Sequence, residues 1–379
     1  MSSPYICNWG ILATGGIAGT FARDLLLDPA SRDVADVQHR IVAVASSSSA
    51  ARAQAFVDDD LALRDAPQKP SAYGTYAEML KNDDVHIVYV ATPHSLHYEN
   101  VLQCLEAGKH VCCEVRVCKP MTINAKQTAH LIALAKEKNL FLMEALWIRF
   151  FPLMAELRKQ LHEQRVIGDI VRVESYNGMA FAFDAQHRLW NPELGGGSLL
   201  DLGIYSLTWQ MVTLFEDPRN ERTPPKVHAT IIKQPQTGVD ESTTMLLEFA
   251  KSHTHGVCSS NAVVRTHHAY SCVIQGTKGD ISVAFPPFRP ESFSVALRND
   301  DALKTLGARK TYDFPIPGHG MFWEADAAAR CLRDGKLQPE LHPNANAQLT
   351  MEIMDEARKQ GGFAYPDKLE WVREDAPQQ

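Results

Sequence analysis

The chain has 379 residues, of which 45% are hydrophobic and 22% charged, and its formal net charge is −7. This length exceeds one ordinary hydrophobic core and the composition excludes a disordered chain, so we expect a globular protein of two domains. The acidic balance and the lack of a long basic run argue against nucleic acid or an anionic membrane as a partner.

The compartment is expected to be cytoplasmic. No apolar run is long enough to cross a bilayer, and the first residues lack the basic and apolar regions of a signal peptide. The eight cysteines include no C-x-x-C motif, so we expect buried free thiols. The histidine pairs 253/255 and 267/268 have no cysteines or acidic cluster beside them, and no metal site is expected.

The first predicted elements lie in the stretch Tyr5–Gly19, where an apolar run that indicates a strand leads through a turn of small residues into a helix from Ile17. Small residues let the backbone approach a pyrophosphate, and the N–H groups of the helix start point toward the anion. The turn has alanine at two of the three positions that are glycine in the dinucleotide motif. Taken alone, it therefore fits a binding turn and a plain strand–helix turn equally well. The candidate cofactor residues are Ala13, Thr14, Gly15, Gly16, Ile17 and Ala18.

A second strand is predicted at residues 41–46, and a run of serines follows it. An NAD-binding domain usually has Asp or Glu at this point to bind the ribose 2′-hydroxyl. Here serine hydroxyls and Arg52 suit a 2′-phosphate better, so we expect NADP rather than NAD. The alternative for the serines is an ordinary helix N-cap. The candidate residues are Ser46, Ser47, Ser48 and Arg52.

The pattern of strand and helix continues to residue 145. Strands are predicted at 85–91, 109–114 and 140–143, and helices at 98–107 and 125–138. This alternation predicts a doubly wound parallel sheet, an α/β Rossmann domain over residues 1–145. Ligands bind such sheets at the carboxyl ends of the strands. The candidate residues there are Thr92, Pro93, His94, His97, Glu114 and Lys119.

The pattern then changes to strands joined by turns. Strands are predicted at 170–176, 227–232, 242–249, 255–261, 270–276 and 279–284, with helices at 153–164, 198–214 and 319–335. We therefore expect an α+β domain over residues 146–379, with a largely antiparallel, open sheet and helices on one face.

Several motifs in this order resemble the glucose–fructose oxidoreductase / inositol dehydrogenase family of NAD(P)-dependent enzymes. Within it they are most similar to the branch of dimeric dihydrodiol dehydrogenases and NADP-dependent D-xylose 1-dehydrogenases. The motifs are Trp9–Ala18, Thr92-Pro93-His94-Ser95-x-His97, Ala107–Val111, Lys119-Pro120, Glu144–Pro152 and Gly195–Tyr205. One departure stands out, because the family has Glu-Lys-Pro where this chain has four more residues, 115–118, between Glu114 and Lys119.

The resemblance implies that Tyr205 transfers the substrate's proton and that Lys119 is its electrostatic neighbour. Free tyrosine titrates near pH ~10, and a nearby ammonium lowers that value. Asp201 lies four residues before Tyr205, which places both on one face of a helix. The alternatives are a core tyrosine and an acid that stabilises a helix N-terminus.

A substrate pocket is expected from aromatic residues and arginines near these motifs. The candidates are Trp147, Phe150, Arg188 and Trp190, together with Asp201 and Tyr205, and Trp147 and Arg149 are also candidates for cofactor binding. Core packing is the alternative for the aromatic residues.

The function that the resemblance implies is oxidation of the anomeric hydroxyl of an aldopentose such as D-xylose, with hydride transfer to NADP and a lactone as product. One alternative is oxidation of trans-dihydrodiols. Another is a cofactor-binding sensor or regulatory protein with weak catalysis. The resemblance also implies a homodimer formed through the C-terminal sheet.

Overall fold

The computed structural model describes residues 3–114 and 120–373. The chain folds as two compact units. The first takes its described residues from Met1–Phe150, Ile316–Gln348 and Trp371–Gln379, and the second is Phe151–Pro315 with Leu349–Glu370. The predicted boundary at residue 145 lies close to the first crossing between the units, whereas residues 316–348 return to the first unit.

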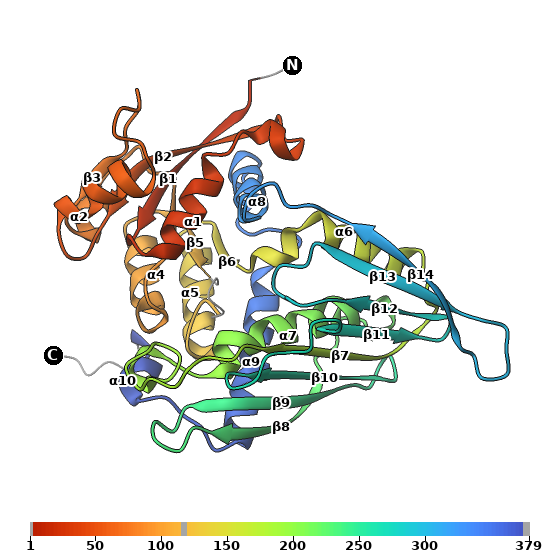
Figure 1. Ribbon diagram of the computed structural model, residues 1–379. Coiled ribbons are helices and arrows are strands. Elements are labelled where there is room, and N and C mark those ends of the chain that lie inside the picture. Colours follow the sequence, from red (N-terminus) through yellow and green to blue (C-terminus); the bar gives the residue numbers. More distant parts are fainter. Residues whose placement is uncertain (1–2, 115–119, 374–379) are drawn as a thin grey trace. The chain divides into compact units, whose positions relative to one another are not determined.

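The first unit is built on a six-stranded parallel sheet, drawn from red to yellow in Figure 1. Its strands are β1 (Tyr5–Leu12), β2 (Val37–Ala45), β3 (Ser71–Tyr73), β4 (Ile87–Val90), β5 (His110–Glu114) and β6 (Leu142–Ala145). The order β3-β2-β1-β4-β5-β6 reverses direction between β1 and β4. This is the order of a Rossmann sheet, so the predicted fold is confirmed, and the reversal is where such sheets bind dinucleotides.

The α-helices of the first unit are α1 (Gly16–Leu25), α2 (Ala50–Ala55), α3 (Tyr76–Leu80), α4 (His97–Glu106), α5 (Ala125–Glu137) and α8 (Phe322–Arg333). Three of them, α2, α3 and α5, begin with a side-chain cap. The side chains of Ser49, Thr75 and Asn124 each accept an N–H bond in the first turn of α2, α3 and α5. These caps fix where the helices start after their strands.

The late segment around α8 is held to the first unit by buried ionic bonds. Arg32 donates from Nε and Nη2 to the two oxygens of Asp326, each at 2.9 Å. His39 Nδ1 accepts from Trp9 Nε1 at 3.1 Å, which leaves His39 Nε2–H to donate to Asp326 at 2.8 Å. Because Asp326 belongs to α8 and its partners to the N-terminal segment, this network explains why residues 316–348 return.

The second unit is built on an eight-stranded sheet, drawn from green to blue in Figure 1. Its strands are β7 (Ile170–Gly178), β8 (Lys226–Lys233), β9 (Asp240–Phe249), β10 (Thr254–Asn261), β11 (Cys272–Gly276), β12 (Gly279–Val283), β13 (Ser292–Arg298) and β14 (Leu306–Asp313). In the order β14-β13-β12-β11-β7-β10-β9-β8, the β7–β10 pair is parallel and the other pairs are antiparallel. The expected largely antiparallel sheet is confirmed.

One face of this sheet is covered by a long helical segment. Its helical elements are α7 (Ile204–Gln210) with wider π-type turns on both sides, Leu199–Gly203 and Met211–Phe215. Ser175 and Asn177 of β7 donate to the carbonyls of Ser206 and Leu202. On the other face of β9, Thr244, Leu246 and Glu248 are exposed. The sheet thus has one buried and one open face, as its alternating sequence predicts.

Three further α-helices lie among the described residues. They are α6 (Pro152–Arg158), α9 (Asn344–Gln360) and α10 (Asp367–Glu370). The sequence predicted α6, but it did not identify α9 or α10, nor the strands β3, β13 and β14. Among the described residues, no helix combines the length and apolar character needed to cross a membrane.

Candidate active site

The residues that follow the strands of the first unit lie in a row along one edge. Leu12 of β1 is level with Ala45 of β2 and with Val90 of β4. The hydrogen bond from Ala13 N–H to the Ala45 carbonyl, at 3.0 Å, continues this row beyond the strands. The candidate cofactor residues after β1, β2 and β4 are therefore neighbours at the carboxyl edge of the sheet.

The turn between β1 and α1 has the geometry of an anion-binding turn. Ala13 has φ +97°, a conformation that favours glycine, so this alanine is strained at the motif's first glycine position. A Cβ on Gly15 or Gly16 would meet no atom within 4 Å, and no described side chain caps the helix at Gly15. The open space and the uncapped N–H groups fit a pyrophosphate at this helix start.

The serine cluster lies beside that turn. Ser46 Oγ and Ser48 Oγ are 2.9 Å apart, and Arg52 Nη2 donates to the Thr14 carbonyl at 3.1 Å. Ser49 is an ordinary N-cap, since its hydroxyl accepts from Arg52 N–H. Arg52 also lies 3.8 Å from the partly exposed Asp60 carboxylate, a weak pair. The exposed guanidinium with hydroxyls around it fits a 2′-phosphate.

The end of β4 offers one more polar group toward a ligand. The buried Thr92 hydroxyl has no hydrogen-bond partner among the described residues. The two histidines that follow bind backbone carbonyls, His94 to Thr122 and His97 to Thr92, both at 2.9 Å. They therefore shape the loop after β4, and the role of Thr92 in cofactor binding stays a prediction. Pro93 precedes the short helical turn that begins at His94.

The described candidates at the ends of β5 and β6, which are Glu114, Trp147 and Arg149, are buried. Lys119 and the residues 115–118 before it lie outside the described residues, and Glu114 is buried at the end of β5. Trp147 stacks on His319 with ring centres 5.4 Å apart, and Arg149 donates from Nε and Nη2 to the Leu341 carbonyl. These contacts hold the returning segment, which is a structural role, and the cofactor role of both residues stays a prediction.

In the second unit the glycine turn before α7 is tightly packed. A Cβ on Gly196 would lie 2.7–2.8 Å from the carbonyl oxygens of Arg188, Leu189 and Asn191. Gly197 has φ +127°, where a side chain is strained. Glycine is thus required for the turn to approach the loop that carries Arg188.

Asp201 and Arg188 form the central ion pair of this unit's candidate site. Arg188 Nη1 donates to both oxygens of Asp201, at 2.8 and 2.7 Å. Asp201 is 1% exposed, whereas the Arg188 side chain is 35% exposed. The sequence predicted both residues but not their pairing. Because a carboxylate so close to a guanidinium is held in its charged form, Asp201 can accept a hydrogen bond from a hydroxyl.

Tyr205 lies four residues after Asp201 and is buried, with 1% of its surface exposed. Its ring packs against Phe288, with ring centres 5.7 Å apart. It follows the π-type turn Leu199–Gly203, and such turns are frequent at functional sites. Of the aromatic candidates, Trp190 is buried and donates to the Ala182 carbonyl, and Phe150 is buried in the first unit.

Two residues at the glycine turn were not predicted. The Tyr365 hydroxyl donates to the Gly196 carbonyl at 2.6 Å. The Asp240 carboxylate accepts hydrogen bonds from Ser198 and Leu199. Both are far from the turn in the sequence, and no motif marks either one.

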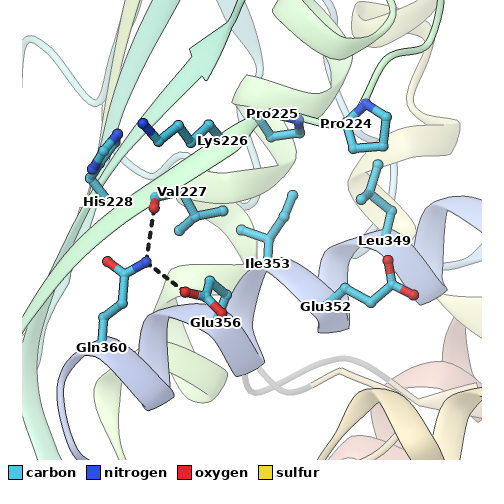
Figure 2. Close-up of a pocket in the computed structure, with 10 residues that line it drawn as sticks. All are labelled: Pro224, Pro225, Lys226, Val227, His228, Leu349, Glu352, Ile353, Glu356 and Gln360. Carbon is cyan, nitrogen blue, oxygen red and sulfur yellow. Dashed lines mark hydrogen bonds between the residues drawn. The ribbon is translucent and has the colours of Figure 1, made fainter.

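A separate groove of about 500 Å³ in the second unit lies between β8 and α9 (Figure 2). The side chain of Gln360 bridges this groove. Its amide accepts a hydrogen bond from Ala229 N–H and donates one to the Val227 carbonyl, which are the two kinds of bond that a neighbouring strand would make with β8. The groove contains none of the predicted site residues. Its bridging amide instead shields the edge of β8 from pairing with another chain.

Comparisons with known proteins identify the family. Residues 7–146 match the oxidoreductase family with an NAD-binding Rossmann fold, and residues 156–282 match the GFO/IDH/MocA C-terminal domain. The chain is 43% identical to the NADP(+)-dependent D-xylose 1-dehydrogenase of Hypocrea jecorina, over 97% of this chain and 95% of that protein. It is 34% identical to the trans-1,2-dihydrobenzene-1,2-diol dehydrogenase of Mus musculus, over 95% and 98%.

Solved structures have the same fold at lower identity. Levoglucosan dehydrogenase, in complex with NADH and levoglucosan, matches with a TM-score of 0.77 at 20% identity, over 94% of this chain and 97% of that one. A 3-ketoreductase from Actinomadura kijaniata, in complex with NADP, matches with a TM-score of 0.75 at 21% identity, over 94% and 98%. With both domains matched in order, the chain belongs to the GFO/IDH/MocA family of oxidoreductases.

Proposed function

We propose that the protein is an NADP-dependent dehydrogenase that oxidises the anomeric hydroxyl of D-xylose to the lactone. The observation that carries this proposal is the 43% identity to a D-xylose 1-dehydrogenase (NADP(+)) over 97% of the chain. The serine cluster and Arg52 beside the turn after β1 support NADP as the cofactor.

The reaction requires a hydride acceptor and a proton acceptor. NADP⁺, when bound, accepts the hydride that leaves the anomeric carbon. Residues of the first unit would bind this cofactor. The N-terminus of α1 would bind the pyrophosphate, and Arg52 with the serines would bind the 2′-phosphate. Thr92 would bind another polar group of the cofactor.

The proton of the sugar hydroxyl passes to Tyr205 as the anomeric carbon becomes the lactone carbonyl. Asp201, charged and paired with Arg188, accepts a hydrogen bond from a neighbouring sugar hydroxyl and orients the ring. Lys119, which the family resemblance places beside the proton acceptor, lies outside the described residues.

The decisive experiment mixes the purified protein with NADP⁺ and D-xylose and follows the absorbance of reduced nicotinamide. We expect turnover with NADP⁺ to exceed turnover with NAD⁺. Arg52→Ala should weaken binding of NADP⁺ and leave NAD⁺ affinity unchanged, and equal effects on both would contradict the 2′-phosphate assignment. Tight NADP⁺ binding without turnover of any sugar or diol would instead support a sensor.

A second candidate activity is the oxidation of trans-dihydrodiols. Relatives at 33–34% identity over about 95% of the chain are dihydrodiol dehydrogenases, which favours this activity as a side reaction. The same assay with trans-1,2-dihydrobenzene-1,2-diol in place of the sugar tests it, and a higher kcat/KM for the diol would reverse the order of the two proposals.

We also infer that the protein acts as a homodimer formed through the open face of the eight-stranded sheet. Leu246 of β9 is 40% exposed on that face, with the partly buried Val257 of β10 opposite it in register. A second copy would cover these apolar side chains.

A further inference from the structure

The helical segment that carries the candidate catalytic residues begins on a buried carboxylate. Asp240, the first residue of β9, accepts through Oδ2 from Ser198 Oγ at 2.8 Å and from Leu199 N–H at 2.5 Å. Thr243 Oγ1 donates to the same oxygen at 3.2 Å. The carboxylate therefore acts as the N-terminal cap of the segment, although it comes from a different element.

The other oxygen of Asp240 lies against the glycine turn. A Cβ on Gly197 would be 2.0 Å from Asp240 Oδ1, so the carboxylate and the turn are packed without a gap. From the other side, the Tyr365 hydroxyl donates to the Gly196 carbonyl. The first turn of the segment then follows directly, because Asp201 N–H donates to the Gly197 carbonyl at 3.3 Å.

We propose that Asp240 is a positioning residue, which holds Asp201 and Tyr205 in the orientation that oxidation of the substrate requires. It acts by fixing Gly197, Ser198 and Leu199, from which the segment starts. The inference rests on the proposed function only where it refers to turnover.

The charge on Asp240 is sensitive to pH. Burial raises the pKa of its carboxyl to about 6, although hydrogen bonds from Ser198, Leu199 and Thr243 oppose the increase. Tyr365 interacts electrostatically with Asp240, and the same tyrosine also interacts with Arg358, Glu370 and Asp201. As the pH falls through about 6 the carboxylate loses its charge, and the hydrogen bonds that it accepts from its three donors weaken.

The kinetic test compares Asp240→Ala and Asp240→Asn with the wild type. We expect kcat for D-xylose to fall by about 10- to 100-fold in Asp240→Ala, because a displaced proton acceptor reacts slowly. The KM for NADP⁺ should stay unchanged. The kcat of Asp240→Asn should be higher than that of Asp240→Ala, since the amide oxygen of asparagine still accepts a hydrogen bond from Leu199. Because asparagine does not titrate, a decline in kcat near pH 6 that is seen in the wild type should be absent from Asp240→Asn.

The matched control is Asp280→Asn. Asp280 is also a buried carboxylate at the start of a strand in this sheet, but it pairs with Arg298 on β13. We expect its kcat and pH profile to match those of the wild type. A loss of kcat equal to that of Asp240→Asn would overturn the proposal, because it would reduce the effect to general stability.

A second measurement does not depend on turnover. Hydrogen–deuterium exchange of residues 197–206 should be faster in Asp240→Ala than in the wild type and in Asp280→Asn, while β7 exchanges equally in all three. Unchanged exchange in this segment would refute the inference even if the enzyme is active. If Asp240→Ala does not fold, the same measurements are made on Ser198→Ala, which removes one hydrogen-bond donor to the carboxylate. This variant should show a smaller fall in kcat and a smaller increase in exchange than those expected for Asp240→Ala.

Discussion

Turnover is expected to depend on the Tyr205 hydroxyl. Phenylalanine would keep the buried ring and its packing on Phe288 but could not accept the proton. We expect Tyr205→Phe to lower kcat by about 10²- to 10⁴-fold. Affinity for NADPH should change little, because the candidate cofactor residues belong to the first unit. Initial rates and a fluorescence titration with NADPH measure both quantities.

The control for this variant is Tyr312→Phe. Tyr312 stacks on Phe293 in the same unit and has no candidate role, so its loss of a hydroxyl should leave kcat unchanged. Wild-type kcat in Tyr205→Phe would refute proton transfer by this residue and would return Tyr205 to the alternative, a tyrosine of the core.

A methyl group at Gly197 is expected to destabilise the second unit. The residue combines φ +127° with a Cβ position 2.0 Å from Asp240 Oδ1. We expect Gly197→Ala to lower the free energy of unfolding by more than about 2 kcal/mol. Gly238→Ala separates backbone strain from steric clash, because Gly238 has φ +76° but a Cβ added there would meet no atom within 4 Å. Equal losses of stability in a thermal melt would mean that strain alone matters.

At the scale of residues, the sequence predicted Asp201 and Tyr205 through their spacing and through the motif around them. It did not predict the partners that hold them. Arg188 pairs with Asp201 across a tight turn, and Asp240 reaches Leu199 from a strand 41 positions away. Such contacts depend on how the sheet is formed, and no local pattern of residue types encodes them.

At the scale of elements, α8 is expected to depend on its buried ion pair. Asp326→Asn would leave the Arg32 guanidinium, whose side chain is fully buried, without its carboxylate. We expect a loss of about 3–5 kcal/mol, measured by denaturant unfolding. Asp36→Asn is the control, because Asp36 pairs with Arg330 and Arg333 of the same helix at the surface. That substitution should cost about 1 kcal/mol or less.

The same network gives the direction of the acid sensitivity. Burial lowers the pKa of His39. Burial acts to raise the pKa of Asp326, but the hydrogen bonds from His39 and Arg32 outweigh it, so the pKa of Asp326 is lowered. For both groups the folded state binds protons less readily than the unfolded state, so stability is lost as the pH falls. For His39 this begins below its ordinary value of ~6.5 and for Asp326 below ~3.9. A wild-type melting temperature that does not fall below pH 6 would contradict this assignment.

The elements that the sequence did not predict have a common physical cause. The helix α9 and the strand β14 carry many polar residues, and β14 has no buried residue in its eight positions. Hydrophobic periodicity is therefore weak there, and the neighbouring elements decide the structure. The strands β4 and β5 are short apolar runs that are almost entirely buried, which is why their sequence alone was sufficient.

At the scale of the molecule, the order of strands and helices was enough to predict both sheets, and the motifs that resemble the family were enough to predict the family. It could not show that residues 316–348 return to the first unit, because the bond that fixes them joins Arg32 to Asp326, 294 positions apart. The alternating strands of the second domain did predict an open sheet face.

That face is expected to hold two copies of the chain together. Leu246→Glu would place a charge on it, opposite Val257 and His228 in register. Burying an unpaired carboxylate in an interface costs several kcal/mol, so the variant should be monomeric where the wild type is dimeric. Light scattering after size-exclusion chromatography measures the mass. Leu303→Glu is the control, because Leu303 is 86% exposed in the loop between β13 and β14. A dimeric Leu246→Glu variant would exclude this face as the interface, and a monomeric wild type would refute the dimer itself.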